Sequence, residues 1–333
     1  MRDWKSWAQS HMKGVENLLM PSFAPGLESL DEEGIRWDVQ KSKEHGFFST
    51  LCTCEAGLEM EESKRFIEIV ADEAGDELSV GITAMLDSFD QNRDLIEHAA
   101  TVGCDTVLLG YPMNWVPDGP EEVFQRTQSL AEAADIGIIL HLNDKYNFGH
   151  LHPSGYPMEI LDRMADIDNA IAMEVSEPAM MGPAHRQVGD RLLLTNPIEG
   201  LIPNHVRAFD MQWFGAGPYE VYQSPDQPML VEYFRQLREG SREDAMETHR
   251  RLTPVRETFM HQMQVPLQVG AYHWPQQKYY QWLMGGNGGY TRQPVMELTM
   301  HDRHSIRQAM RQVGLEPREN DAEFFEGRVN YEE

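Results

Sequence analysis

Two ionisable residues follow short apolar runs of the chain, and their side chains are of types that transfer protons. Glu174 follows residues 170–173, and His141 follows residues 137–140. Burial in a partly apolar site raises the pKa of a carboxyl group, and a nearby carboxylate raises the pKa of a histidine. Both groups would then titrate near neutrality, as general acid–base catalysis requires. We therefore predict Glu174 and His141 as a catalytic pair. The structural alternatives are a salt bridge for Glu174 and a backbone hydrogen bond for His141.

Further polar residues stand at or just after the ends of similar apolar runs. Seven of them are predicted to bind the substrate: Thr53, Glu55, Tyr111, Asn114, Asn143, Lys145 and Asn196. Hydrogen bonds from Asn143, Asn114 and Thr53 would hold an oxyanion or a substrate carboxylate. Lys145 has two other interpretations, as a relocated amine that forms an imine with the substrate and as an ordinary solvated loop lysine.

Two cysteines raise the question of a metal. Cys52 and Cys54, together with His141 and Glu174, offer enough ligand types to bind one. No closely spaced ligand motif accompanies them, so we predict neither a metal nor another cofactor. The cysteines also lack the sequence context of an activated nucleophile, which argues against a cysteine hydrolase.

The elements that would position these residues alternate regularly along the chain. Apolar, β-rich runs predict eight strands, at residues 15–20, 47–52, 78–84, 106–110, 137–142, 170–175, 191–195 and 211–215. Amphipathic patterns between them predict helices at residues 31–44, 61–74, 91–101, 120–134, 156–164 and 203–208. The runs are too apolar for a sheet with one solvent-exposed face, so we predict a parallel sheet buried on both faces.

Eight such units in about 200 residues favour a closed (β/α)8 barrel over an open dinucleotide-binding sheet. The active site of such a barrel lies at the carboxyl ends of its strands. Neighbouring strands lie about 4.8 Å apart, so His141 and Glu174 would be within reach of each other. The expected organisation is a barrel over residues 13–220, C-terminal helices over residues 221–317 and an acidic tail over residues 318–333.

The C-terminal segment predicts helices at residues 230–240, 242–259, 276–286 and 301–315. The aromatic-rich residues 272–286 fit packing on the barrel or contacts between subunits.

The composition excludes several classes of partner. The 333 residues carry 54 acidic and 28 basic side chains, for a formal net charge of -26. Binding to nucleic acid or to an anionic membrane requires clustered Lys and Arg, so neither partner is expected. Three cysteines cannot form a disulfide framework for this length, and no apolar run approaches the roughly 20 residues of a membrane span. We expect a cytoplasmic protein that acts on a small molecule.

Four segments resemble motifs of one enzyme family, in the same order and with the same spacing. They are residues 13–35, similar to its first strand and turn; 58–66, similar to a helix start; 97–125, similar to the passage around its fourth strand; and 285–299, similar to a "G…G-x-x-R-x-P-x-x-x-L" signature. On these residues the chain resembles, over residues 13–317, the dihydrodipicolinate synthase / N-acetylneuraminate lyase family of barrel aldolases. The resemblance implies a TIM barrel, a lyase activity and a homo-oligomer, either a dimer or a tetramer.

The chain differs from this family at the positions of the family's catalytic residues. In the family, a lysine in the strand "N-x-V-G-I-K-D" forms an imine with a 2-oxo acid. Residues 169–175 (NAIAMEV) align with that strand and place Glu174 at the lysine position, and a carboxylate cannot form an imine. The tyrosine and arginine of "L-Y-N-x-P-x-R-x-G" correspond to Leu142 and Asn147, and the second tyrosine of "PYY" corresponds to Asn114.

We therefore expect a divergent lyase. It would cleave a carbon–carbon bond, or add or remove water, in a small oxo or hydroxy acid by acid–base chemistry. Two alternatives stay open: an acid/base- or metal-assisted hydrolase or isomerase on the same barrel, and a non-catalytic binding or regulatory paralogue.

Overall fold

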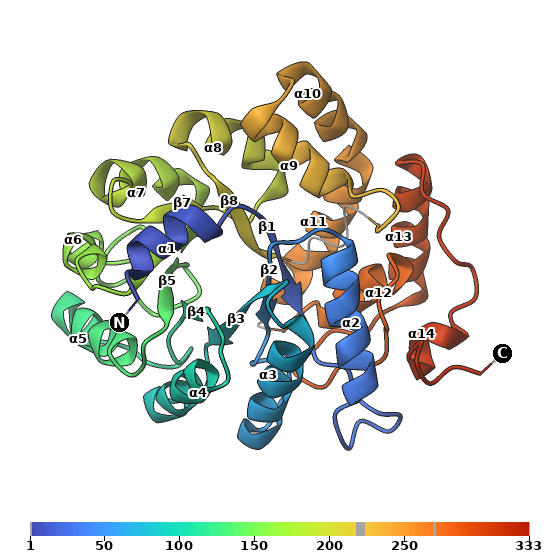
Figure 1. The fold of residues 1–333 in the computed structure, drawn as a ribbon, viewed down its shortest axis with the longest axis horizontal. Helices are drawn as coiled ribbons and strands as arrows, with labels where there is room; N and C mark the ends of the chain where they lie inside the picture. Colours follow the sequence, from blue (N-terminus) through green and yellow to red (C-terminus); the bar gives the residue numbers. More distant parts are fainter. Residues whose placement is uncertain (1, 218–223, 269–270, 333) are drawn as a thin grey trace.

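The computed structural model describes residues 2–217, 224–268 and 271–332. In it, eight parallel strands form one sheet in the order β7-β6-β5-β4-β3-β2-β1-β8 (Figure 1). The strands are β1 (Gly14–Leu19), β2 (Ser49–Cys52), β3 (Ser79–Ala84), β4 (Thr106–Leu109), β5 (Gly137–Leu142), β6 (Ala170–Val175), β7 (Leu193–Thr195) and β8 (Trp213–Gly217). The Thr195 hydroxyl of β7 donates to the Trp213 carbonyl of β8 at 3.1 Å, so the two edges of the sheet meet and the barrel is nearly closed. The predicted (β/α)8 barrel is confirmed. Strands β5 and β6 have the predicted bounds. Both ends of every other strand lie within two residues of the predicted ends.

Helices on the outside of the barrel follow the strands. They are α2 (Glu32–Glu44), α3 (Met60–Ala74), α4 (Phe89–Thr101), α5 (Pro120–Ala131), α6 (Leu161–Ala165), α7 (Met181–Val188) and α8 (Ile202–Phe209). Short 3-10 turns at Met158–Ile160, Pro178–Met180 and Glu199–Leu201 precede the last three. Local sequence starts several of these helices. The Asp31 side chain caps α2 by accepting from the Gly34 N–H, and Glu59 and Glu62 form a capping box at α3.

A helix that the sequence analysis did not predict covers the amino ends of the strands. In α1 (Trp4–His11), Trp4 and Ala8 are buried, and together with Met12 they pack against the residues that fill the barrel interior. Trp4 Nε1 donates to Asp135, just before β5, and Lys5 Nζ donates to the Ala165 carbonyl, before β6. The opposite, carboxyl end of the barrel is therefore the end left for a site.

Proline accounts for two further differences from the predicted helices. Helix α7 was not predicted, because Gly182 and Pro183 favour a loop, but both fall in its first turn, where proline is tolerated. The single helix predicted over residues 242–259 is wrong. It is two helices, α10 (Arg242–Arg251) and α11 (Thr253–Gln268), since Pro254 lacks the N–H that would continue α10.

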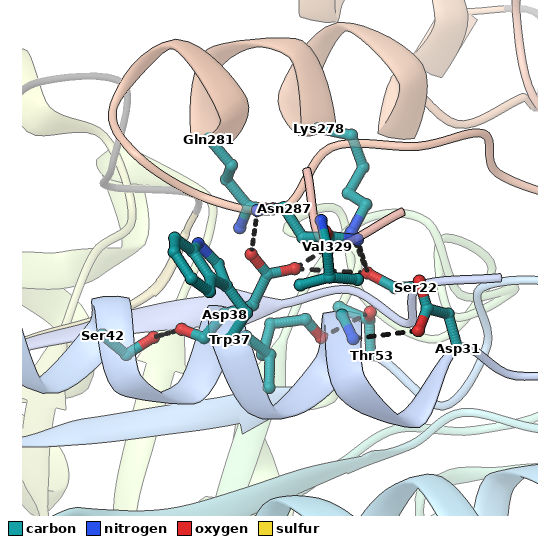
Figure 2. Close-up of polar contacts among 12 residues, drawn as sticks. Ser22, Asp31, Trp37, Asp38, Ser42, Thr53, Lys278, Gln281, Asn287 and Val329 are labelled. Carbon is teal, nitrogen blue, oxygen red and sulfur yellow. Dashed lines mark hydrogen bonds and ion pairs between the residues drawn. The ribbon is translucent and has the colours of Figure 1, made fainter. Parts of the chain in front are cut away.

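A buried ionic network joins the C-terminal helices to the first strand–helix unit (Figure 2). Lys278 of α12 (Trp274–Leu283) is fully buried, and its Nζ donates to Ser22 Oγ at 2.8 Å and lies 3.2 Å from Asp38 Oδ2 of α2. The other carboxylate oxygen of Asp38 accepts the Asn287 backbone N–H at 2.6 Å. A charge buried at this depth needs these partners, so the network fixes α12 to α2.

The remaining helices complete this C-terminal region: α9 (Met229–Glu239), α13 (Met300–Gln312) and α14 (Ala322–Glu326). The acidic residues 318–333 contain α14, whose Phe324 is buried edge-on to Tyr279 at 5.0 Å between ring centroids. The predicted boundary at residue 220 falls in residues 218–223, outside the described residues. No helix in the described part of the chain is long and apolar enough to span a membrane.

Candidate active site

His141 and Glu174 lie side by side at the carboxyl ends of neighbouring strands. The register of β5 and β6 pairs the two residues directly, and His141 Nε2 is 2.7 Å from Glu174 Oε2. The second glutamate oxygen, Oε1, accepts a hydrogen bond from Ser176 Oγ at 2.7 Å. The second imidazole nitrogen, Nδ1, is 2.8 Å from the Tyr146 hydroxyl. The predicted adjacency of His141 and Glu174 is therefore confirmed, and each side chain is held from two sides.

Burial decides the charge of this histidine. Burial lowers the pKa of His141. Glu174 raises this pKa, as expected, but burial has the larger effect, so the expected net rise is wrong. The imidazole is then neutral near pH 7. We assign its single proton to Nε2, where Glu174 accepts it, which leaves Nδ1 to accept from Tyr146.

A cavity of about 920 Å³ opens at this end of the barrel, and the pair lies in its wall. Other polar side chains from the strand ends line it, among them Glu55, Asn143, Lys145 and Ser176. Asn143 Nδ2 donates to Ser176 Oγ at 2.7 Å, while its Oδ1 accepts the Lys145 backbone N–H at 2.9 Å. Asn143 thus connects the loop after β5 to the segment after β6.

Lys145 presents a half-buried amine to the cavity. Its Nζ lies 3.1 Å from Met85 Sδ, and no carboxylate of the described residues lies within ion-pair distance of it. Burial lowers the pKa of Lys145, although Glu55 and Glu174 act in the opposite direction. An ammonium with a lowered pKa is a better proton donor, and its neutral form is a better nucleophile.

Glu55 enters the cavity from the loop after β2. Its carboxylate accepts a hydrogen bond from Thr83 of β3, and Thr83 Oγ1 also accepts the Cys54 N–H at 2.9 Å. A second acid of the cavity wall, Glu199 after β7, is paired with Arg256 of α11. The ion pair of Glu199 ties α11 to the barrel, whereas Glu174 is free of any guanidinium contact among the described residues.

Four of the predicted substrate-binding residues do not line the cavity. Thr53 is buried and donates to the Leu19 carbonyl, and Asn196 is buried and donates to the Val175 carbonyl. Tyr111 is buried with its hydroxyl 2.7 Å from Thr127 Oγ1. Asn114 lies on an exposed loop. Three of these side chains therefore satisfy neighbouring backbone or helix groups, and the fourth faces solvent.

The cysteines do not assemble a metal site or a nucleophile. Cys52 and Cys54 are buried, and burial raises the pKa of both thiols well above the ordinary value. Within residues 2–217, 224–268 and 271–332, no three His, Cys, Asp or Glu side chains converge as metal ligands would. The metal-assisted alternative thus lacks a donor set in this part of the chain.

Residues that the sequence analysis did not select complete the site. Tyr146, four residues after the position of the family tyrosine, hydrogen-bonds His141, and a search for any tyrosine in that loop would have found it. From outside the barrel, α11 and residues 271–274 also line the cavity, including the buried His273. No local pattern in the sequence points them towards β5 and β6.

Comparisons with known proteins agree with the barrel fold. No family model matches the chain. It is 25% identical over 316 residues to the 4-hydroxy-tetrahydrodipicolinate synthase of Methanopyrus kandleri, a match that covers 92% of this chain and 98% of that protein. The structure of dihydrodipicolinate synthase from Aquifex aeolicus is similar with a TM-score of 0.76 and 18% identity, over 92% of this chain and 100% of that one. N-acetylneuraminate lyase from Fusobacterium nucleatum is similar with a TM-score of 0.75 and 13% identity, over 91% and 99% of the two chains. The chain is therefore similar along nearly its whole length to a 4-hydroxy-tetrahydrodipicolinate synthase, and it shares the barrel fold of both solved structures.

Proposed function

We propose that the protein is a lyase that cleaves or forms a carbon–carbon bond, or adds or removes water, in a small oxo or hydroxy acid. The observation that carries this proposal is the 2.7 Å contact between Glu174 and His141 in the wall of the cavity. A carboxylate held by a neutral imidazole is a competent general base, and the relatives of the chain are named as lyases or synthases of this class.

The pair and Lys145 suffice for an aldol cleavage. Glu174 takes the proton of the substrate hydroxyl at C4, the C3–C4 bond breaks, and an aldehyde and the enolate of the oxo acid form. The ammonium of Lys145 stabilises the negative charge on the enolate oxygen. Glu174 then returns its proton to C3 of the enolate, which regenerates the carboxylate and releases the oxo acid. His141 holds the carboxylate in position throughout, and Tyr146 holds His141.

Turnover of 4-hydroxy-2-oxo acids tests this proposal, with pyruvate release followed through lactate dehydrogenase. The Glu174→Gln variant is expected to lose about 10²- to 10⁴-fold in kcat, because the base is removed while the side-chain shape is kept. Glu177→Gln is the matched control, since Glu177 follows the same strand but does not line the cavity. Equal activity of both variants and the unmodified protein would rule out Glu174 as the base.

A second candidate mechanism within the same activity uses Lys145 as a covalent nucleophile. Its support is the lowered pKa of an amine that no carboxylate of the described residues pairs with. Borohydride added with pyruvate separates the two mechanisms. The acid–base proposal expects no trapped adduct, whereas a mass increase on a peptide containing Lys145 would replace it with imine chemistry.

The proposal includes the physical state of the enzyme. It takes a small-molecule substrate, needs neither nucleic acid nor membrane, and forms a homo-oligomer. Light scattering on the purified chain at several concentrations measures the last point, and a mass equal to one chain at every concentration would contradict it.

A further inference from the structure

The cavity is larger than a small oxo acid requires. Its volume of about 920 Å³ is near the upper end of the roughly 300–1,000 Å³ typical of pockets for drug-sized ligands. The groups assigned to the chemistry, His141, Asn143, Lys145 and Glu174, all come from β5, β6 and the segments that follow them. The rest of the wall is therefore available to another part of the substrate.

A large share of that wall comes from the C-terminal helices. Six of the residues of this region that line the cavity form a surface that we call the roof: Phe259, Met260, Met263, Tyr272, His273 and Trp274. Tyr272 and Trp274 stack in parallel, with ring centroids 4.6 Å apart and an interplanar angle of 10°. Phe259 packs edge-on to His273 at 5.8 Å. The roof is thus a packed aromatic surface with two methionines beside it, and it is fixed to the barrel through the ion pair of Arg256.

The roof carries no charge at neutral pH. His273 is its one residue of a type that ordinarily titrates near neutrality, and burial lowers the pKa of His273 to about 4. Burial first, and then the negative charges of Glu55 and Asp87, raise the pKa of Tyr272, so the charges nearest this surface are acidic. A second carboxylate on the substrate would lose its hydration here and be repelled. An uncharged apolar group would gain from leaving water.

Methionines extend this apolar surface onto the barrel side of the cavity. Met60, Met85 and Met113 line it, in addition to Met260 and Met263 of the roof. Flexible thioether side chains adapt to the shape of the group they contact and pack favourably on aromatic rings. Such a wall is suited to an aromatic or bulky apolar ligand.

We propose that the roof binds an apolar, typically aromatic, substituent of the substrate while the oxo or hydroxy acid group lies at His141, Glu174 and Lys145. This rests on the proposed function for the acid group, and it defines the substrate class as oxo or hydroxy acids with an apolar side group.

Calorimetric titration of the full chain with three probes tests the proposal. Pyruvate carries the acid group alone, phenylpyruvate carries the same group with an aromatic ring, and benzyl alcohol carries the ring alone. Phenylpyruvate is expected to bind at least about tenfold more tightly than pyruvate, because the ring leaves water on binding.

Two variants of the roof and one matched control locate the effect. Met260→Glu and Met263→Glu each add a charge at a partly exposed position of α11, so the fold should tolerate them. Both are expected to abolish the tenfold preference for phenylpyruvate over pyruvate. His261→Glu adds the same charge to an exposed position of α11 that does not line the cavity and should leave both affinities unchanged.

The outcomes separate this proposal from the proposed function. If pyruvate binds and phenylpyruvate binds no more tightly, or if the preference persists in both methionine variants, the roof does not select the substituent and the lyase proposal stands. If phenylpyruvate and benzyl alcohol bind but pyruvate does not, the roof assignment stands and the oxo acid, with the lyase proposal, is rejected. Binding of none of the three probes overturns the roof assignment.

Discussion

Acidification from pH 7 to pH 5 is expected to destabilise this protein through two buried histidines, His45 and His273. Burial lowers the pKa of His45 to about 3 and that of His273 to about 4. In the unfolded chain both side chains titrate at about 6.5. Because the folded-state values are lower, the stability that these groups contribute is complete above pH 6.5 and is lost as the pH falls towards the folded-state values.

The size of the loss follows from the distance below the unfolded-state pKa. One pKa unit corresponds to about 1.4 kcal/mol, and pH 5 is about 1.5 units below 6.5, so each histidine costs about 2 kcal/mol there. Both folded-state pKa values lie at or below about 4, so at pH 5 the two histidines are still mostly unprotonated in the folded protein. Protonation of the folded state therefore offsets little of this loss. Together the two groups lower the free energy of unfolding by about 4 kcal/mol, a large part of the roughly 5–15 kcal/mol of a typical protein.

The acidic surface acts in the opposite direction. A formal net charge of -26 implies self-repulsion in the folded state, which weakens as carboxylates are protonated. The unmodified protein alone therefore reports the sum of two effects. Comparison with His45→Gln, His273→Gln and the double variant isolates the histidines, since all four proteins share the same surface carboxylates. His304→Gln, at an exposed position of α13, is the control.

Urea unfolding at pH 7, 6 and 5, read by far-UV circular dichroism, measures the effect. Each buried-histidine variant should lose about 2 kcal/mol less than the unmodified protein between pH 7 and pH 5, and the double variant about 4 kcal/mol less. The His304 variant should follow the unmodified protein. A double variant with an unchanged pH dependence would refute the assignment of these two histidines as neutral buried groups.

Two more outcomes follow from other buried charges. Lys278→Met should lower the free energy of unfolding by about 3–5 kcal/mol in urea titrations, because it leaves the Asp38 carboxylate buried without its ammonium partner. Lys64→Met, at a partly exposed ion pair with Asp94, should have little effect, and equal losses would contradict the role of burial. The His141 imidazole should titrate below 6.5 by proton NMR, and lower still in Glu174→Gln, where the attraction that raises its pKa is gone. A rise in that variant would mean that the assigned sign is wrong.

Much of the barrel could be predicted from local patterns because buried parallel strands are continuous apolar runs. Both β5 and β6 were predicted with their observed bounds, and they contain His141 and Glu174. The helices that were missed or misjoined involve residues with opposing local and tertiary effects. Gly182 and Pro183 disfavour a helix locally but fall in the first turn of α7. The prediction of one helix over residues 242–259 overlooked the break that Pro254 imposes.

The site was predictable only as far as strand ends determine it. His141, Asn143 and Glu174 line the cavity because parallel strands bring their carboxyl ends together. Thr53 and Asn196 also stand at strand ends, yet their side chains satisfy backbone carbonyls of neighbouring strands. Position along a strand shows which residues can reach the cavity, but the direction of a short polar side chain depends on which backbone group needs a partner.

Two of the glutamates that line the cavity, Glu174 and Glu199, show what position at a strand end leaves undecided. Glu174 lies near the end of β6 and Glu199 lies after β7, and both are buried and line the same cavity. Arg256, 57 residues further along the chain on α11, pairs with Glu199, whereas Glu174 meets the histidine of the adjacent strand. A guanidinium stays protonated at any physiological pH and therefore fixes its partner as a carboxylate, but an imidazole can hold or release a proton within that range. The capacity for proton transfer is thus set by the partner of the acid rather than by the acid itself. Only the folded chain shows that the partner of Glu174 is an imidazole rather than a guanidinium.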